Sequence, residues 1–279
     1  MKKFLGTTYT VLLYLFALIG LVLTLGYIAV YFHLTDTAGI VDLQNQAFQE
    51  AARNASSTVP IDTAWEQTPE WATLQQAIAK DQGVIAQVSV ITGVDQRLIV
   101  AQLVVEQLRV YTSEREVFKS VFAPLSILGS QSQFSWGIMG IKEDTAIQIE
   151  NNLQESTSPY YLGPQYQHLL DFSTDNPTEE RFSRLTNEDN HYYDYLYTAL
   201  YLKQIETQWK NAGFDISDRP EILSTLYNIG FQHSNPNANP SVGGAEIPIN
   251  GRIYSFGSLA YDFYFSTELT NLFPQMIKK

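Results

Sequence analysis

The sequence predicts a mainly α-helical protein with a single transmembrane helix ahead of its folded domain. Apolar residues recur at helical spacing along most of the chain, whereas alternation with a period of two is limited to a short piece near residues 247–254. Residues 11–32 are almost wholly apolar. The chain has 279 residues, 45% hydrophobic and 13% aromatic, which is enough to build a packed core.

The N-terminal segment decides the expected location. No charged residue lies between Lys3 and Asp36, and a membrane span needs roughly 20 apolar residues. We interpret residues 1–35 as a cytoplasmic tip and an uncleaved signal anchor, with a cleaved signal peptide as the alternative. The positive-inside rule then predicts a single-pass plasma-membrane protein, held in the membrane through residues 11–32, with a cytoplasmic N-terminus and an extracytoplasmic domain.

A polar segment separates this expected anchor from the domain. Residues 36–67 are rich in Ala, Ser, Thr and Asn, which is typical of an extracytoplasmic stem, and residues 41–53 within them favour a helix. Thr68 followed by Pro69 indicates a helix start. The domain is therefore expected to cover residues 68–279, and its first helix to run to about residue 91.

The next helix, residues 96–109, is apolar on nearly all sides, which predicts a place at the centre of the domain. Asn250-Gly251 between apolar pairs indicates a short β-hairpin. The tyrosines of residues 192–201 are interpreted as core rather than as a sugar-stacking surface. Further helices are expected over residues 142–153, 190–212 and 220–228, and the aromatic residues 253–269 are expected to close the domain against the central helix.

Composition excludes several function classes. Lys and Arg total 17 against 29 Asp and Glu, and a net charge of −12 is the wrong sign for a nucleic-acid partner. The chain has no cysteine, and its four histidines are scattered without metal-ligand spacing. No glycine-rich phosphate loop occurs. We therefore expect no metal, no cofactor and no nucleic acid.

One carboxylate lies within the central apolar helix. Helical spacing puts Ile99, Leu103 and Val110 on the same side as Glu106. Burial favours the protonated form of a carboxyl group and raises its pKa, which suits a general acid acting on a glycosidic oxygen. The alternatives are a structural ion pair with Arg109 or Arg115, or a place on the one exposed edge of the helix.

Two further segments resemble the signatures of a known family. The segment QFSWGIMGIKEDTA, residues 133–146, resembles the S-x-G-[IL]-M-Q-[IL]-x-P-x-T-A signature of the lysozyme-like lytic transglycosylases, the family of the soluble lytic transglycosylase domains and goose-type lysozyme. The segment LYNIG, residues 226–230, resembles their A-Y-N-A-G signature. Together with Glu106 these segments follow the family's order over residues 93–230. The resemblance implies a lysozyme-like helical domain.

The resemblance also implies roles for individual residues. Glu106 corresponds to the catalytic acid and base, generally the sole essential carboxylate of that family. The other correspondences concern substrate binding: Ser135 near the reacting sugar, Gly137 and Met139 in the loop that shapes the cleft floor, Tyr227 as a hydrogen-bond partner of the catalytic Glu, and Asn228 beside it.

The sequence departs from the signature in places. Gly140 stands where the family commonly has Gln, Glu143 replaces the usual Pro, and the segment between Glu106 and Ser135 is longer than in compact members. Glu143 or Asp144 is the candidate second carboxylate that a hydrolase would use.

The expected function is a membrane-anchored peptidoglycan lytic transglycosylase, which cleaves the MurNAc-β-1,4-GlcNAc bond of glycan strands. The alternatives are a hydrolytic muramidase and a catalytically inactive wall-binding or assembly factor of the same fold.

Overall fold

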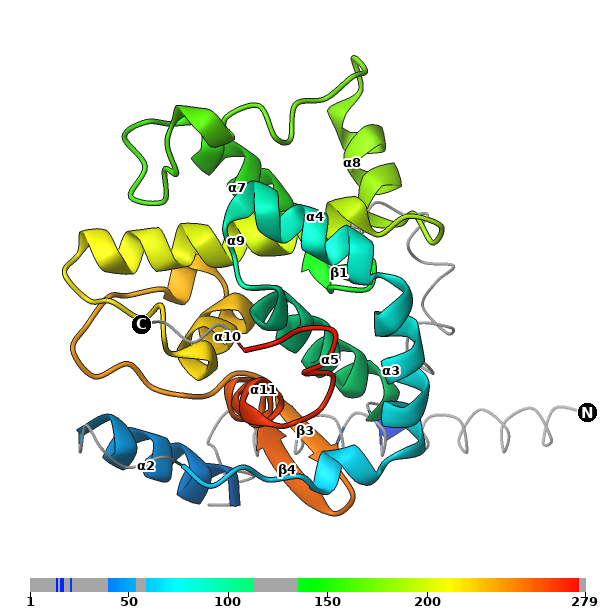
Figure 1. Cartoon of the computed structure of the whole chain (residues 1–279), viewed down its shortest axis with the longest axis vertical. Helices are drawn as coiled ribbons and strands as arrows, with labels where there is room; N and C mark the ends of the chain where they lie inside the picture. Colours follow the sequence, from blue (N-terminus) through cyan, green and yellow to red (C-terminus); the bar gives the residue numbers. More distant parts are fainter. Residues whose placement is uncertain are drawn as a thin grey trace, which may run out of the picture. The chain divides into compact units, whose positions relative to one another are not determined.

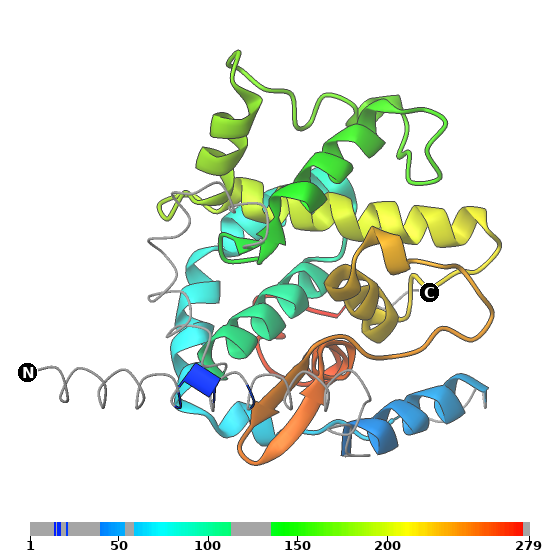
Figure 2. The same cartoon turned by 180° about the vertical axis from the view of Figure 1, so that it is seen from behind.

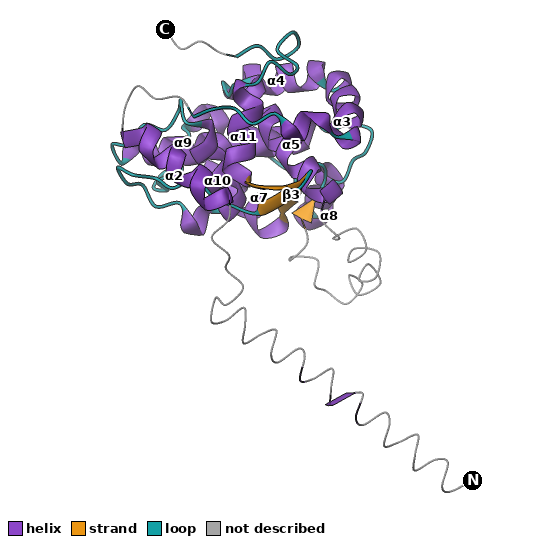
Figure 3. Ribbon diagram, turned by 90° about the horizontal axis from the view of Figure 1, so that it is seen from below, coloured by secondary structure: helices purple, strands orange, loops and turns teal. Residues whose placement is uncertain are grey.

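The computed structural model describes residues 40–53, 59–112 and 135–275, together with the single residues 14, 16, 17 and 21. The chain divides into two units, Met1–Gly39 and Ile40–Lys279, and the architecture below is that of the second. Its described part is mainly helical with small antiparallel sheets (Figures 1 and 3), which confirms the predicted mainly α class.

The described helices and strands follow one another along the chain. The helices are α2 (Ile40–Arg53), α3 (Pro69–Lys80), α4 (Gln82–Thr92), α5 (Gln96–Thr112), α7 (Glu143–Gln154), α8 (Pro177–Leu185), α9 (Tyr192–Asn211), α10 (Pro220–Ile229) and α11 (Phe256–Phe265). The strands are β1 (Ser135–Trp136), β2 (Ile141–Lys142), β3 (Glu246–Ile249) and β4 (Arg252–Ser255), and the 3-10 turn η5 (Phe231–His233) follows α10.

The predicted membrane anchor requires a correction. A span needs a continuous helix of about 20 residues as well as apolar side chains. Among the residues that the structure describes, no helix is long and apolar enough to cross a membrane. Residues 11–32 lie outside the described residues except for four single positions. The transmembrane helix, the single-pass plasma-membrane location and the membrane contact derived from it are therefore withdrawn.

The central position expected for α5 is confirmed. Ile99, Val100, Val104 and Val105 are fully buried, and α5 contacts α3, α4, α9, α10, α11 and β3 (Figure 1). This burial on several sides follows from a helix that is apolar nearly all round. The C-terminal segment closes on the same helix, because Arg97 of α5 donates hydrogen bonds to backbone carbonyls between Phe263 and Phe273.

The helix predicted from residue 69 to about residue 91 is in fact two helices. Thr68 caps α3 through its side-chain oxygen, which accepts from the Trp71 N–H at 3.1 Å. The two helices are separated by Asp81. Its carboxylate accepts a hydrogen bond from the Tyr195 hydroxyl at 2.6 Å and lies 2.7 Å from Nδ1 of His191. Both partners are far away in sequence, so helical spacing alone misses the break.

Two local predictions near the C-terminus are confirmed. Asn250 and Gly251 both have positive φ, 50° and 75°, and form the turn of the β3–β4 hairpin. In α9 the side chains of Tyr195, Tyr197 and Tyr201 are buried in the core as expected, whereas Tyr192 and Tyr193 are half-buried and pack against it.

Part of the expected stem packs against the domain. Phe48 of α2 is 2% exposed and meets the Tyr261 ring edge-on, with centroids 4.7 Å apart. Gln49 donates to the Pro240 carbonyl at 2.9 Å. Helix α2 is thus an amphipathic helix docked on the C-terminal elements rather than a free spacer.

Candidate active site

A cavity of about 380 Å³ lies where the C-terminal half of α5 meets the β1–β2 hairpin, the start of α7, and helices α9 and α10. Figure 2 shows the side of the molecule on which α7 lies beside α9. The cavity brings together residues from motifs more than 100 positions apart. Its lining includes Glu106, Arg109, Gly140, Lys142, Asp144, Thr145, Gln148, Tyr201, Tyr227, Asn228, Gly230 and His233.

Glu106 is buried at this cavity, as the sequence predicts, and it is ion-paired. The residue is 4% exposed. Nε of Arg109 donates to Glu106 Oε2 at 3.0 Å, and Nη2 of Arg109 contacts the same oxygen. A guanidinium stabilises the ionised carboxylate, which opposes the effect of burial. The alternative role, an ion pair with Arg109, is therefore present in this structure.

Gly140 lies directly against that carboxylate. Its φ is +65°, and a β-carbon at this position would lie 2.8 Å from Glu106 Oε2 and 2.9 Å from Cδ. A real β-carbon essentially never approaches another atom so closely. The glycine found in place of the family's Gln therefore allows the turn to pack on Glu106, and a Gln here would displace the carboxylate.

Tyr227 joins the two signature segments. Its hydroxyl donates to the Met139 carbonyl at 2.8 Å and lies 3.3 Å from the Thr198 hydroxyl. A phenol has one proton to donate, and here it goes to Met139. Burial raises the pKa of Tyr227 well above its usual range, and the charge of Glu106 adds to this effect. Met139 itself is fully buried and is not among the described residues that line the cavity.

Asn228 lines the cavity but also supports a neighbouring loop. Its Oδ1 accepts from the Ala245 N–H at 2.8 Å, and a β-carbon at Gly244 would lie 2.9 Å from the same oxygen. The side chain therefore fixes the loop after η5 as well as bordering the cavity.

The remaining predicted site residues do not join this group. Ser135 belongs to β1, paired with Lys142, but its side chain lies outside the described residues. Gly137 lines a different cavity, of about 280 Å³, together with Asp194 and His191. A β-carbon at Gly137 would lie 2.0 Å from Asp194 Oδ1, so only glycine fits there.

Asp194 is a functional candidate that the sequence analysis missed. It is 1% exposed, and burial raises its pKa to about 8, although the N–H groups of Ile138 and Met139 partly offset this by favouring the charged form. The sequence feature that could have indicated it is a single acidic residue within the buried aromatic part of α9. The carboxyl group supports the β1–β2 turn that carries Gly140.

The two candidate second carboxylates have different surroundings. Asp144 is exposed and lines the Glu106 cavity. Glu143 lies 3.9 Å from Arg181, which also pairs with Glu150 at 2.7 Å. Asp144 is thus the acid available to a molecule bound beside Glu106.

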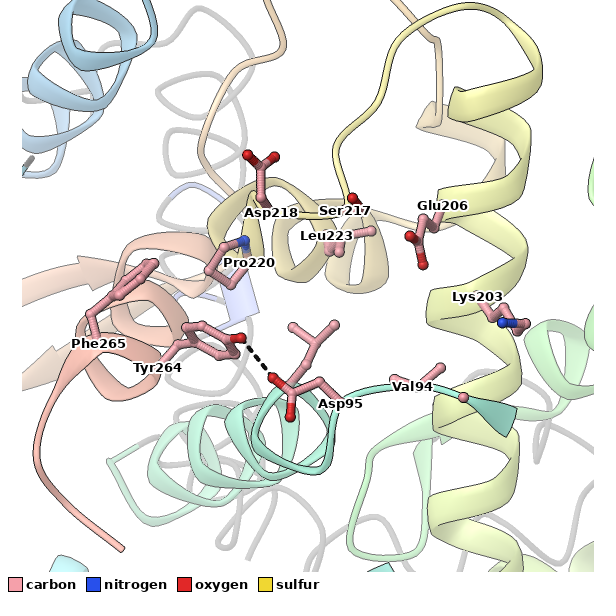
Figure 4. Close-up of a pocket in the computed structure, with 12 residues that line it drawn as sticks. Val94, Asp95, Lys203, Glu206, Ser217, Asp218, Pro220, Leu223, Tyr264 and Phe265 are labelled. Carbon is pink, nitrogen blue, oxygen red and sulfur yellow. Dashed lines mark hydrogen bonds between the residues drawn. The ribbon is translucent and has the colours of Figure 1, made fainter. Parts of the chain in front are cut away.

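A second and larger cavity, of about 440 Å³, lies on another part of the domain. Figure 4 shows Lys203 and Glu206 of α9 on one side and Tyr264, which donates to Asp95 at 2.6 Å, on the other. None of the predicted site residues lines it. Among the described residues, no group of three or more histidine and acidic side chains is placed to hold a metal ion.

No family model, curated protein or solved structure matches the chain. The family resemblance therefore rests on the residues of the signature segments alone.

Proposed function

We propose that the protein is a peptidoglycan lytic transglycosylase that cleaves the MurNAc-β-1,4-GlcNAc bond with Glu106 as its single acid and base. One observation carries the proposal: buried Glu106, the Gly140 turn and the Tyr227-Asn228 pair come from three separate segments and meet at one cavity. This is the set of segments for which the sequence resembles the family. A cavity with a buried carboxylate at its wall is also the arrangement that glycoside cleavage needs.

The chemistry assigned to Glu106 has two steps. Protonated Glu106 donates its proton to the glycosidic oxygen while the bond between that oxygen and C1 of MurNAc breaks. The carboxylate then takes the proton of the 6-hydroxyl of the same sugar as this oxygen bonds to C1. The product is a 1,6-anhydro sugar, and no water enters the reaction.

Gly140 and Tyr227 support the catalytic role of Glu106 by fixing the turn against which its carboxylate lies. The turn at Gly140 contacts the carboxylate of Glu106, and the Tyr227 hydroxyl holds the same turn through the Met139 carbonyl. A catalytic acid needs a fixed geometry toward the bond that it protonates. The hydrogen bond from Tyr227 thus orients the wall against which Glu106 lies.

A muramidase is the second candidate, and Asp144 favours it. This exposed acid lines the same cavity as Glu106. An inverting hydrolase uses a second carboxylate to activate water on the opposite face of the sugar. The Glu106–Arg109 ion pair, in turn, is the observation that favours a non-catalytic wall-binding protein.

The experiment is product analysis on purified sacculi. We expect the wild type to release anhydro-muropeptides and Glu106→Gln to release none. Glu221→Gln is the matched control, because Glu221 is also a buried glutamate paired with an arginine, Arg219, but lies outside the cavity. Products with reducing ends would assign the protein as a muramidase. Equal turnover by wild type and Glu106→Gln, or no turnover by wild type, would contradict the proposal.

A further inference from the structure

The turn between β1 and β2, residues 137–140, is held by side chains from helices outside the hairpin. The carbonyl of Ile138 accepts a hydrogen bond from Nε2 of Gln107 in α5 at 2.6 Å. The carbonyl of Met139 accepts one from the hydroxyl of Tyr227 in α10 at 2.8 Å. The carbonyls of both inner residues of the turn therefore have a side-chain partner, and the two partners come from different helices.

Two buried carboxyl groups lie against the two ends of the same turn. A β-carbon at Gly137 would lie 2.0 Å from Asp194 Oδ1, and one at Gly140 would lie 2.8 Å from Glu106 Oε2. Both glycines have positive φ, 63° and 65°. The turn thus fits between α9 and α5 without room for a side chain at either end. A displacement of the turn toward α5 would press on the carboxylate of Glu106.

Gln107 joins this turn to the helix that carries the acid. It follows Glu106 directly in α5 and is half-buried. Its hydrogen bond to Ile138 therefore relates the position of the turn to the backbone of α5 at the catalytic residue itself. Gln107 is not among the described residues that line the Glu106 cavity. Any effect of Gln107 on the proposed reaction must therefore pass through the turn.

We infer that Gln107 is a positioning residue, whose hydrogen bond to Ile138 fixes the turn against which Glu106 lies and so confines the carboxylate. The inference rests on the proposed function. Displacement of a catalytic group by about 1 Å can lower a rate on the order of 100-fold. Loss of the hydrogen bond should therefore slow the chemical step, whereas the side chains that line the cavity, and with them glycan binding, stay unchanged.

The test is the cleavage of soluble peptidoglycan strands by the full-length protein and by Gln107→Met, which keeps the size of the side chain but has no donor. We expect kcat to fall on the order of 10- to 100-fold, with KM changed by less than about twofold. Gln107→Glu, which replaces the donor by an acceptor, is a second variant with the same expected result.

Gln82→Met is the matched control for these variants. Gln82 is also half-buried and donates to a backbone carbonyl, that of Leu272 at 3.3 Å, but it is not among the described residues at the cavity. Its substitution should leave kcat unchanged. A Gln107→Met protein with the kcat of wild type, or with a KM that rises as much as kcat falls, would overturn the inference.

Amide hydrogen exchange separates this inference from the proposed function, because it needs no turnover. The amides of residues 138–141 should exchange on the order of tenfold faster in Gln107→Met than in wild type, the factor for one hydrogen bond, and unchanged in Gln82→Met. Faster exchange supports the role of Gln107 in holding the turn even if wild type cleaves no glycan. Equal exchange in wild type and Gln107→Met would refute it even if wild type cleaves sacculi. Thermal unfolding verifies that each variant is folded.

Discussion

The carboxylate of Glu106 occupies the space that a side chain at Gly140 would need, since a β-carbon at position 140 would lie 2.8 Å from Glu106 Oε2. This close approach joins the central helix to the turn of the β1–β2 hairpin. It also accounts for the most evident departure from the family signature, since a larger residue at position 140 would occupy the space of the carboxylate.

Gly140→Ala should therefore impair activity as well as folding. The substitution adds a methyl group against Glu106 and places alanine at a φ of +65°. The backbone conformation alone costs about 1 to 2 kcal/mol, and displacement of the carboxylate should lower sacculus cleavage tenfold or more. Gly251→Ala is the control, with a φ of +75° and, among the described residues, no atom within 4 Å of the added carbon. Comparable activity in both variants would show that Glu106 tolerates the displacement.

The pH dependence of stability should reflect Asp194 and Asp262. Burial raises the pKa of each to about 8, from an ordinary value of 3.8 for an aspartate. Between these two pKa values the unfolded chain loses protons that the folded protein keeps. The contribution of these two groups to stability is therefore fully present below about pH 4 and is lost as the pH rises to about 8. In Asp194→Asn the stability should decrease less with rising pH than in wild type.

The measurement is the melting temperature of wild type and Asp194→Asn between pH 4 and 9. The melting temperature of Asp194→Asn should increase relative to that of wild type as the pH rises, and that of Asp262→Asn should behave in the same way. A melting-temperature difference that stays constant over this range would show that Asp194 is ionised in the folded protein.

Local signals in the sequence predicted several features correctly. The burial of Glu106 follows from the apolar spacing of α5, and the hairpin follows from Asn250-Gly251, because both depend on residues close together in the chain. The pairing of Glu106 with Arg109 also lies within one helical turn, so the sequence offered it as an alternative. Helical spacing is compatible with both roles of Glu106, the catalytic acid and the structural ion pair with Arg109.

Features that depend on distant partners were not predictable in this way. At the break between α3 and α4, Asp81 is contacted by Tyr195 of α9 and by His191, the residue before that helix. In the sequence Gly140 is only a departure from the family's Gln, and the approach of the Glu106 carboxylate gives the physical reason for it. The docking of α2 depends on Phe48 meeting Tyr261, which is more than 200 residues away.

Phe48→Ala should destabilise the domain if α2 is one of its integral elements. Phe48 is 2% exposed and packs on Tyr261, and removing a buried aromatic ring typically costs about 3 to 5 kcal/mol. The free energy of unfolding, measured with denaturant, tests this. Val90→Ala is the control, since Val90 is 84% exposed and should change stability by no more than about 0.5 kcal/mol. An equally small effect of Phe48→Ala would mean that α2 contributes nothing to the domain's stability.

Arg97 should resist conservative replacement, because its guanidinium organises the C-terminal segment. It is fully buried and donates to the carbonyls of Phe263, Tyr264, Ser266, Glu268 and Phe273 at 2.6 to 3.1 Å. Lysine has three rotatable donors instead of five fixed ones, so Arg97→Lys leaves buried carbonyls without a partner. We expect a loss of about 2 to 4 kcal/mol in the free energy of unfolding.

The control is Arg252→Lys, since the Arg252 side chain is 51% exposed and its pair with Asp62 is a surface interaction. That change should cost no more than about 1 kcal/mol. A similar small loss for Arg97→Lys would mean that water or a shifted backbone satisfies the freed carbonyls. In that case the C-terminal segment would be held by its aromatic packing, and Arg97 would be dispensable for closing the domain on α5.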